Sequence, residues 1–492
     1  MVPRQVSMIR ATCKTFAPIV AFVTLAFVGC SGDGNPMEIE GEVWDGPDLR
    51  EVYTLETLEL DDVDYPHANG PDDPGYDDRV ELGRLLFFDR ILSGRQDISC
   101  GDCHHPAIAW VDANDLSPGV SGIGLGPERE LTDPNILLMP RNTLTNLNVG
   151  LSAAVPGGPP SAQGVLFWDG RANSLEQQAF QPTATIDEMS GHLPNYDMAT
   201  YPDSSAAGFV MERLRGFPGY VEAFRRGFPL ESAEMDQHPE DLDKHVIRRN
   251  TFERAIGAYQ RELITIDSPY DRWVRGDDDA LTVPQLRGAD LFYGKAGCAE
   301  CHSGPMFSDY SFSRAGVKDN PLSPGRLPTE RGGSGTGIDV GRQENSGLPG
   351  DYYKFRVPTL RNVELTGPWF RHGQAESLRE VVIFHALAGH EPDAVADPER
   401  HAIWEKYIGF HRQGNVDYLL TPDQLDPRLQ FVELTDDEVD DIVDFMRALT
   451  DRTIDGRADP RVPDEVPSGL PTVEKLEPFS LVPFPQHVDS PR

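Results

Sequence analysis

The chain has 492 residues and a formal net charge of −36, because 80 Asp and Glu outnumber 44 Lys and Arg. Its length is typical of two or three domains, and 39% hydrophobic residues are enough to build globular cores. The acidity argues against nucleic-acid binding, which needs a basic face, and against an anionic lipid surface as the main partner. A basic protein partner is compatible with it.

The first 30 residues are typical of an export signal. Basic residues precede an apolar run over 16–28, which is too short to span a bilayer but has the length of a signal-peptide core. The run ends Phe27-Val28-Gly29-Cys30. This resembles a bacterial lipobox, although that pattern prefers leucine where Phe27 stands. We expect lipid attachment at Cys30 and a periplasmic location on the outer membrane, with an ordinary cleaved signal as the alternative. No other apolar run is long enough for a transmembrane helix.

The next elements are an acidic linker and a series of helices separated by long Gly- and Pro-rich loops. Residues 31–75 are acidic and rich in Pro and Gly, which indicates a solvated linker or a surface wrap. Apolar residues at helical spacing predict helices over 78–87, 252–263, 286–292 and 435–449. The chain is therefore expected to be mainly α-helical.

Four of the six cysteines lie in two copies of one pattern. The copies are Cys100-Gly-Asp-Cys103-His104 and Cys298-Ala-Glu-Cys301-His302. In c-type cytochromes two such thiols bind the haem covalently, and the adjacent histidine binds the iron. A structural zinc site would need its four ligands in one small module, but these pairs are far apart in the chain. A thioredoxin-like site would not need a histidine after both pairs. We predict two c-type haems, each with the histidine of its motif as proximal ligand.

These sites divide the chain. We expect a signal at 1–30, a linker at 31–75, an N-terminal haem domain at 76–250, a C-terminal haem domain at 251–455 and a Pro-rich extended tail at 456–492.

Several further segments resemble landmarks of the bacterial di-haem cytochrome c peroxidase family. They are Leu86-Phe87-Phe88-Asp89, Arg141-Asn142-Thr143, Phe167-Trp168-Asp169-Gly170-Arg171, Glu188-Met189, Pro358-Thr359-Leu360-Arg361-Asn362 and Thr366-Gly367-Pro368-Trp369-Phe370. The resemblance covers about residues 76–450 in order. The family includes peroxidases that take electrons from small c-type cytochromes or copper proteins, and the methylamine-utilisation enzyme that oxidises tryptophans of a partner protein. The implied fold is mainly α, with two cytochrome-c-like haem domains and a calcium ion between them.

The resemblance also implies roles for individual residues. Glu188 matches the acid that moves a proton on peroxide bound at the first haem, and Trp168 matches the tryptophan between the haems. Asn142, with the carbonyls of Thr366 and Pro368, matches the calcium site, an oxygen-only set that suits this cation. Without the family, Glu188 could be an exposed loop residue, Trp168 a packing aromatic and Asn142 a turn residue.

One departure from the family concerns the first haem. Classical members carry a capping histidine between the first motif and the matched asparagine, but residues 106–141 contain none, and the matched position is Pro134. We therefore expect the first haem to be open or water-bound in the resting state, without a need for reductive activation. The methylamine-utilisation branch shares this feature.

A second departure concerns the distal ligand of the second haem, which is Met or Tyr in the family. Here a capping box, Ser377-Leu378-Arg379-Glu380, begins a helix whose apolar face leads to His385. We predict His385 as the distal ligand, with His372 and His390 as competitors and Met446 as a core residue. Two histidines should lower the potential of this haem relative to His/Met ligation.

The sequence thus predicts an oxidoreductase that reduces hydrogen peroxide at the N-terminal haem with electrons relayed through the C-terminal haem. The expected donor is a small c-type cytochrome, a copper protein or a partner that becomes modified. One alternative is an enzyme that oxidises tryptophan or tyrosine in a partner protein. Another is a non-catalytic di-haem electron carrier.

Overall fold

The computed structural model describes most of the chain between residues 37 and 475. The described ranges are 37–39, 42–57, 70–133, 138–152, 164–191, 206–241, 245–321, 323, 339–388, 396–408, 420, 424–453 and 459–475. The predicted signal, Pro134 and His390 lie outside them. No helix in the part that the structure describes is long and apolar enough to cross a membrane.

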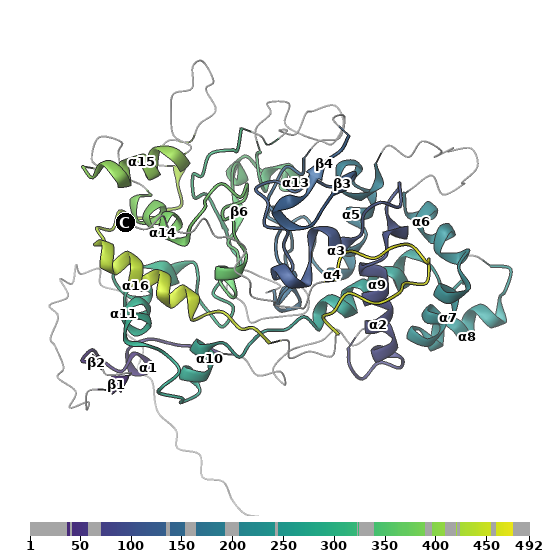
Figure 1. The fold of residues 1–492 in the computed structure, drawn as a ribbon, viewed down its shortest axis with the longest axis horizontal. Helices are drawn as coiled ribbons and strands as arrows, with labels where there is room; N and C mark the ends of the chain where they lie inside the picture. The colour runs from purple at the N-terminus through teal and green to yellow at the C-terminus, as the bar shows by residue number, and fades with distance from the viewer. Residues whose placement is uncertain are drawn as a thin grey trace, which may run out of the picture.

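The fold is mainly helical, as predicted, and falls into two halves (Figure 1). The helices of the N-terminal half are α2 (Tyr76–Phe87), α3 (Cys100–Cys103), α4 (Leu175–Ala179), α5 (Gln181–Ala184), α6 (Ala206–Arg215), α7 (Pro218–Gly227), α8 (Pro229–Gln237) and α9 (Arg249–Arg261). Those of the C-terminal half are α10 (Pro269–Val274), α11 (Val283–Tyr293), α13 (Gln343–Ser346), α14 (Leu378–Leu387), α15 (Pro398–Tyr407) and α16 (Asp436–Arg447).

In the part of the chain that the structure describes, the strands form three small antiparallel pairs. They are β1 (Met37–Ile39) with β2 (Glu42–Trp44), β3 (Gly122–Ile123) with β4 (Glu130–Leu131), and β5 (Phe312–Ser313) with β6 (Phe355–Arg356). In the last pair Phe312 lies opposite Arg356. These short ribbons arrange loops and do not form a core of their own.

Each half is organised around one close helix crossing at a glycine. In the N-terminal half α2 crosses α9, and a Cβ added at Gly83 would lie 2.0 Å from the carbonyl oxygen of Ala255. In the C-terminal half α11 crosses α16, and a Cβ added at Gly288 would lie 1.9 Å from the carbonyl oxygen of Asp441. Only a residue without a side chain permits backbones to approach so closely. The helix that leads to each cysteine motif is therefore positioned in the same way.

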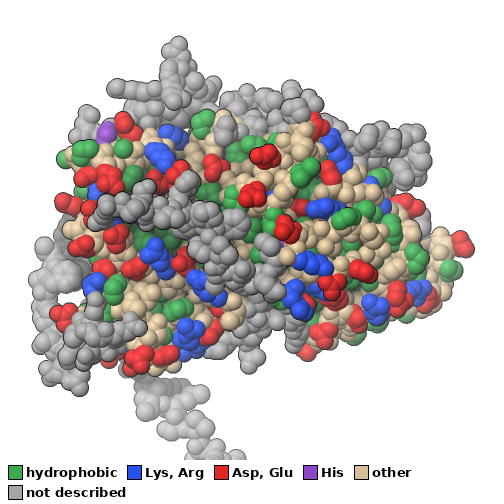
Figure 2. Space-filling view, in the orientation of Figure 1, with side chains coloured by type: hydrophobic (Ala, Val, Ile, Leu, Met, Phe, Trp, Pro, Cys, Tyr) green, Lys and Arg blue, Asp and Glu red, His purple; other side chains and the backbone are tan. Residues whose placement is uncertain are grey.

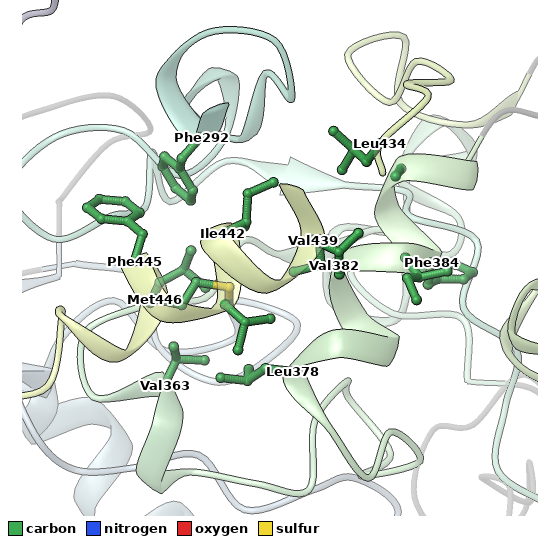
Figure 3. Close-up of a cluster of buried hydrophobic side chains, with 14 of the residues drawn as sticks. Phe292, Val363, Leu378, Val382, Phe384, Leu434, Val439, Ile442, Phe445 and Met446 are labelled. Carbon is green, nitrogen blue, oxygen red and sulfur yellow. The ribbon is translucent and has the colours of Figure 1, made fainter. Parts of the chain in front are cut away.

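The C-terminal core fills the space between α11, α14 and α16. Figure 3 shows Ile442, Phe445 and Met446 of α16 packed against Phe292 of α11 and Val382 of α14, and all five are buried. The helix α16 begins where predicted, since the Thr435 hydroxyl accepts the Glu438 N–H. Met446 belongs to this core, as the sequence suggested.

The structure differs from the predicted domain boundary at residue 251. Residues 252–263 were expected to open the C-terminal domain, but Phe252, Ile256 and Tyr259 of α9 lie in the N-terminal core. The apolar stripe of α9 predicts a buried helix, yet periodicity carries no information about which core it joins. The N-terminal core therefore extends to Leu263.

The two outer segments of the chain cross to the opposite halves. Trp44, the last residue of β2, and Leu49, the first residue of α1 (Leu49–Val52), belong to the C-terminal core. Residues 31–75 were expected to form a linker or a surface wrap. Val462 and Val473 belong to the N-terminal core. Figure 1 shows α1 below α11 and near α10, and the yellow 459–475 segment running past α3 and α9. Each half is thus completed by the far end of the chain.

The surface carries both signs of charge. On the face in Figure 2, Lys and Arg side chains are dispersed among Asp and Glu and do not gather into one basic area. The described residues of this face thus show no single basic area, and the whole chain has a net charge of −36.

Candidate haem-binding site

The first cysteine motif lies on a single helical turn with its histidine fixed by a carbonyl. Cys100 and Cys103 are the ends of α3, and neither forms a disulfide. His104 places Nδ1 3.0 Å from the carbonyl oxygen of Trp110. A carbonyl only accepts, so Nδ1 carries the hydrogen and Nε2 keeps a lone pair that can bind iron. Burial lowers the pKa of His104, which favours the neutral imidazole that a metal needs.

The second motif repeats this arrangement. Cys298 and Cys301 share one turn, and neither forms a disulfide. His302 Nδ1 lies 3.1 Å from the carbonyl oxygen of Phe307, again leaving Nε2 available. Burial, with a smaller contribution from the nearby His385, lowers the pKa of His302 to about 4.

A cavity of about 430 Å³ lies between the second motif and α14. Its wall includes Cys298, Cys301, His302 and His385. His385 Nδ1 lies 2.8 Å from the Val381 carbonyl oxygen, so its Nε2 is the nitrogen that remains for a ligand bond. Two thiols and two neutral imidazoles around one largely apolar space are the donor set of a c-type haem with two histidine ligands. The residues present therefore fit that group.

His372, the described competitor of His385, uses both ring nitrogens elsewhere. Its Nδ1 accepts the Asn320 N–H at 3.0 Å, and Nε2 donates to Asp339 at 3.3 Å. His372 does not contribute to the wall of the cavity. The other competitor, His390, lies outside the described residues.

Glu188 lies in the N-terminal half, on a short turn held from both sides. The turn is a π-helix over Ile186–Ser190. The carbonyl of Asp187 accepts the Val120 N–H and that of Met189 accepts the Gly94 N–H, both at 2.9 Å. Glu188 is half-buried, and it is close enough to Cys100 to raise the pKa of that thiol, whose largest shift comes from burial. The structure therefore brings Glu188 to the first motif.

Trp168 lies between two segments that each lead to a proximal histidine. Its indole Nε1 donates to the carbonyl of Asn142 at 3.0 Å, and its own carbonyl accepts the Arg356 N–H at 2.8 Å. Leu144, two residues after Asn142, contacts the ring of His104 through its backbone. Pro358, two residues after Arg356, contacts the ring of His302 in the same way. Trp168 also lines the cavity. Trp168 is therefore bonded to the two segments that lie beside the two motifs.

The predicted calcium ligands are all among the described residues. Asn142, Thr366 and Pro368 all contribute to the wall of the same cavity. The Asn142 amide nitrogen donates to the Asn114 carbonyl at 2.8 Å, so its side-chain oxygen is the atom that could bind a cation. In the described ranges no three His, Cys, Asp or Glu side chains form a metal-binding group. The predicted set uses amide and carbonyl oxygens, and calcium binding stays a prediction.

The chain contains a duplication that the sequence analysis missed. The two copies are Thr145-Asn146-Leu147-Asn148 and Thr359-Leu360-Arg361-Asn362. The first hydroxyl donates to the Ala109 carbonyl at 2.6 Å and the second to the Met306 carbonyl at 2.5 Å. Each accepting residue directly precedes the one whose carbonyl fixes the proximal histidine. The repeated Thr-x-x-Asn downstream of each motif is the signal that could have revealed it.

A buried ionic cluster near Trp168 was also missed. Arg141 bonds Asp169 at 2.7 Å and Asp339 at 2.8 Å, and Asp339 is the partner of His372. Arg141, next to Asn142, thereby ties the loop of Trp168 to the C-terminal half. These residues lie far apart in the sequence, so no local pattern could have joined them.

Comparisons with known proteins identify related chains. A family model described as di-haem cytochrome c peroxidase matches residues 77–279. The methylamine utilization protein MauG of Methylorubrum extorquens is 32% identical over 383 residues, which are 77% of this chain and 88% of that protein. Cytochrome c551 peroxidase of Pseudomonas aeruginosa is 30% identical over 342 residues, or 70% and 81% of the two chains.

Solved structures share the fold. A MauG-like protein associated with microbial copper homeostasis is 24% identical, with a TM-score of 0.56, over 85% of this chain and 98% of that one. The di-haem peroxidase BthA of Burkholderia thailandensis is 23% identical, with a TM-score of 0.55, over 77% and 86% of the two chains.

Proposed function

The chain belongs to the di-haem cytochrome c peroxidase family, and we propose that it reduces hydrogen peroxide at the His104 haem with electrons that arrive through the His302 haem. As a member of this family it is an oxidoreductase with two c-type haems. When bound, these groups supply the iron centres that exchange electrons and the open coordination position for peroxide. The observation that carries the proposal is the placement of Trp168 between the segments that contact the two proximal histidines.

Glu188 is the proton-transfer residue in this proposal. Reduction of peroxide takes two electrons and two protons and releases two waters. A carboxylate beside the reacting oxygens can take the proton from the inner oxygen and return it to the outer one as the O–O bond breaks. The turn that carries Glu188 is held by two backbone hydrogen bonds, so the side chain is positioned before substrate arrives.

We also propose that the first site is open in the resting ferric protein. Residues 106–141 offer no histidine. His105, next to the proximal ligand, is already engaged, because its Nδ1 accepts the Ala107 N–H and its Nε2 donates to the Glu474 carbonyl at 2.9 Å. Peroxide can then bind without prior reduction of the second haem.

The His385 arrangement favours a second candidate function. Ligation by two histidines lowers the potential of the second haem, which makes it a poor acceptor from a high-potential cytochrome. Such a site is better suited to holding an oxidising equivalent that is shared through Trp168. In that case the donor is a tryptophan or tyrosine of a partner protein, which becomes oxidised.

Three accessory features complete the proposal. The donor is a protein, either a small c-type cytochrome or copper protein or a partner that becomes modified. A calcium ion at Asn142, Thr366 and Pro368 stabilises the region between the halves. The protein is exported and anchored to the outer membrane through a lipid on Cys30. A Cys30→Ala variant that still partitions with membranes would contradict the anchor.

The decisive experiment is an electron paramagnetic resonance and optical titration of the ferric protein with hydrogen peroxide. We expect one high-spin and one low-spin haem and a reaction without pre-reduction. Glu188→Gln should slow that reaction about 10²-fold or more, while the exposed control Glu222→Gln on α7 should not. A near-infrared charge-resonance band would favour the protein-modifying alternative.

Three outcomes would contradict parts of the proposal. Two low-spin haems that are inert to peroxide would exclude the open first site. Reactivity only after one-electron reduction would indicate a switchable peroxidase. No reactivity in either state would leave an electron carrier.

A further inference from the structure

Five cationic side chains line the cavity of the second motif, and one of them differs from the rest. They are Lys295, Arg356, Arg361, Arg371 and Arg428. Four have a protein carboxylate as partner: Glu438 for Lys295 at 2.6 Å, Asp271 for Arg361 at 2.7 Å, Asp319 for Arg371 and Asp309 for Arg428 at 2.7 Å. Arg356 has no carboxylate within 4 Å among the residues that the structure places.

Arg356 is nevertheless deeply buried. It is 9% exposed and lies on β6. Its Nε donates to the carbonyl of Phe167 at 3.0 Å, and its guanidinium lies 5.8 Å from the ring of Tyr310. Asp169 also acts on Arg356 from beyond 4 Å, but this carboxylate is already paired with Arg141 and Arg171. A neutral acceptor, a distant aromatic ring and a remote, already paired carboxylate do not compensate a buried charge, which costs several kcal/mol when it lacks a counter-ion. Burial accordingly lowers the pKa of Arg356.

We propose that Arg356 forms an ion pair with a propionate of the second haem. A haem carries two carboxylates at one edge, so binding it in this cavity brings in anions that the chain does not supply. Arg356 shares the cavity wall with the predicted axial ligands, and the other four cations already have partners. A planar guanidinium also matches a carboxylate better than an ammonium does.

This assignment gives Arg356 a second task, as a positioning residue for Trp168. Its backbone N–H donates to the Trp168 carbonyl at 2.8 Å, and its side chain holds the carbonyl of the preceding Phe167. Removal of its charge therefore affects both the potential of the second haem and the loop between the haems. The inference rests on the haem assignment within the proposed function, and it is independent of peroxide reduction.

The test is spectroelectrochemistry of both haems in Arg356→Gln and Arg356→Lys. A cation near the iron favours the reduced state, so Gln should lower the midpoint potential of the His302 haem more than that of the His104 haem. Lys keeps the charge and should restore most of the wild-type value. Arg342, stacked at 3.8 Å over Phe312 beside the same ribbon, provides the control, and Arg342→Gln should leave both potentials unchanged. Haem content must stay at two per chain.

Two patterns would overturn the proposal. If Gln leaves the potential unchanged while both haems are bound, Arg356 has no electrostatic contact with the second haem. If Lys and Gln lower it equally, Arg356 acts only through its bond to Phe167. Should Gln prevent haem binding, redox-induced infrared difference spectra of the wild type decide the matter. A protonated-carboxyl band assigned to a propionate of the second haem would then overturn the ion pair.

Discussion

The two halves of the molecule share their proximal architecture and differ on the distal side. In both halves, a close crossing at a glycine positions the helix that precedes the cysteine motif. A threonine hydroxyl donates to the backbone carbonyl of Ala109 or Met306. The carbonyl of the next residue accepts a hydrogen bond from the proximal histidine. On the distal side the N-terminal half presents Glu188 on a π-helical turn, while the C-terminal half presents His385 on α14. The two cysteine motifs are therefore held in the same way, and in the proposed function one residue of each half, Glu188 or His385, sets the chemistry of its haem.

The duplication also diverges at one buried position. Leu147 in the first copy corresponds to Arg361 in the second. Leu147 packs in the N-terminal core, whereas Arg361 makes two 2.7 Å bonds to Asp271, and both side chains are fully buried. The same backbone turn thus supports an apolar contact in one half and an ion pair in the other.

The largest expected effect comes from removing the cysteines of one haem-attachment site at a time. Replacing Cys298 and Cys301 with Ala should reduce covalent haem from two to one per chain and leave the His104 site spectroscopically intact. Replacing Cys100 and Cys103 should do the reverse. The haem-to-protein ratio after denaturing electrophoresis measures this. If either double variant lost both haems, the halves would not be independent units.

Giving the second copy the leucine of the first, at the position of Arg361, should have the next largest effect. Arg361→Leu leaves Asp271 as an unpaired buried carboxylate and should destabilise the C-terminal half by about 3–5 kcal/mol. Burial alone would raise the pKa of Asp271, but the bonds from Arg361 hold it below its ordinary value. The ion pair therefore stabilises the fold above the unfolded pKa and is lost as pH falls through the folded pKa. Denaturant unfolding at neutral and acid pH should show the difference between variant and wild type shrinking on acidification, and a constant difference would contradict the assignment.

The matched helix crossings should respond alike. Gly83→Ala and Gly288→Ala each force a methyl group into a backbone carbonyl and should cost about 1–3 kcal/mol of unfolding free energy. Gly350→Ala, where nothing lies within 4 Å of the added carbon, should change it by less than about 0.5 kcal/mol. A large loss at only one crossing would show that the two are not equivalent.

The smallest expected loss of stability comes from the N-terminal segment that packs on the C-terminal half. The Tyr53 hydroxyl donates to Asp290 of α11 at 2.8 Å. Tyr53→Phe removes this bond and should cost about 1 kcal/mol, with the loss confined to amide protection of the C-terminal half in hydrogen exchange. Equal loss in both halves would argue against the separation of the two cores.

The sequence was most informative where function depends on local spacing. The family, the two c-type haems that it implies, the mainly helical fold with two cytochrome-c-like domains and the enzyme class are confirmed. The Ser377 cap of α14 is confirmed too, although Glu380 accepts from the Glu376 N–H and not from Ser377. Such features are set by residues within a few positions of each other.

Features that depend on distant contacts could not be predicted. The membership of α9 in the N-terminal core depends on its crossing with α2. Arg356 differs from the other four cations of the cavity wall because each of those is paired with a carboxylate, and these pairs are formed by residues distant in the sequence. The roles of Glu188, Trp168 and His385 stay predictions, now with a geometry that suits them.

The crossed outer segments have a consequence for biogenesis. The Glu474 carbonyl binds His105, directly beside the proximal ligand of the first haem, so the earliest motif is enclosed by residues synthesised almost 370 positions later. The contact between the 459–475 segment and the first motif can therefore form only after residue 475 has been synthesised. Trimming this segment would damage the half of the protein that lies at the opposite end of the sequence.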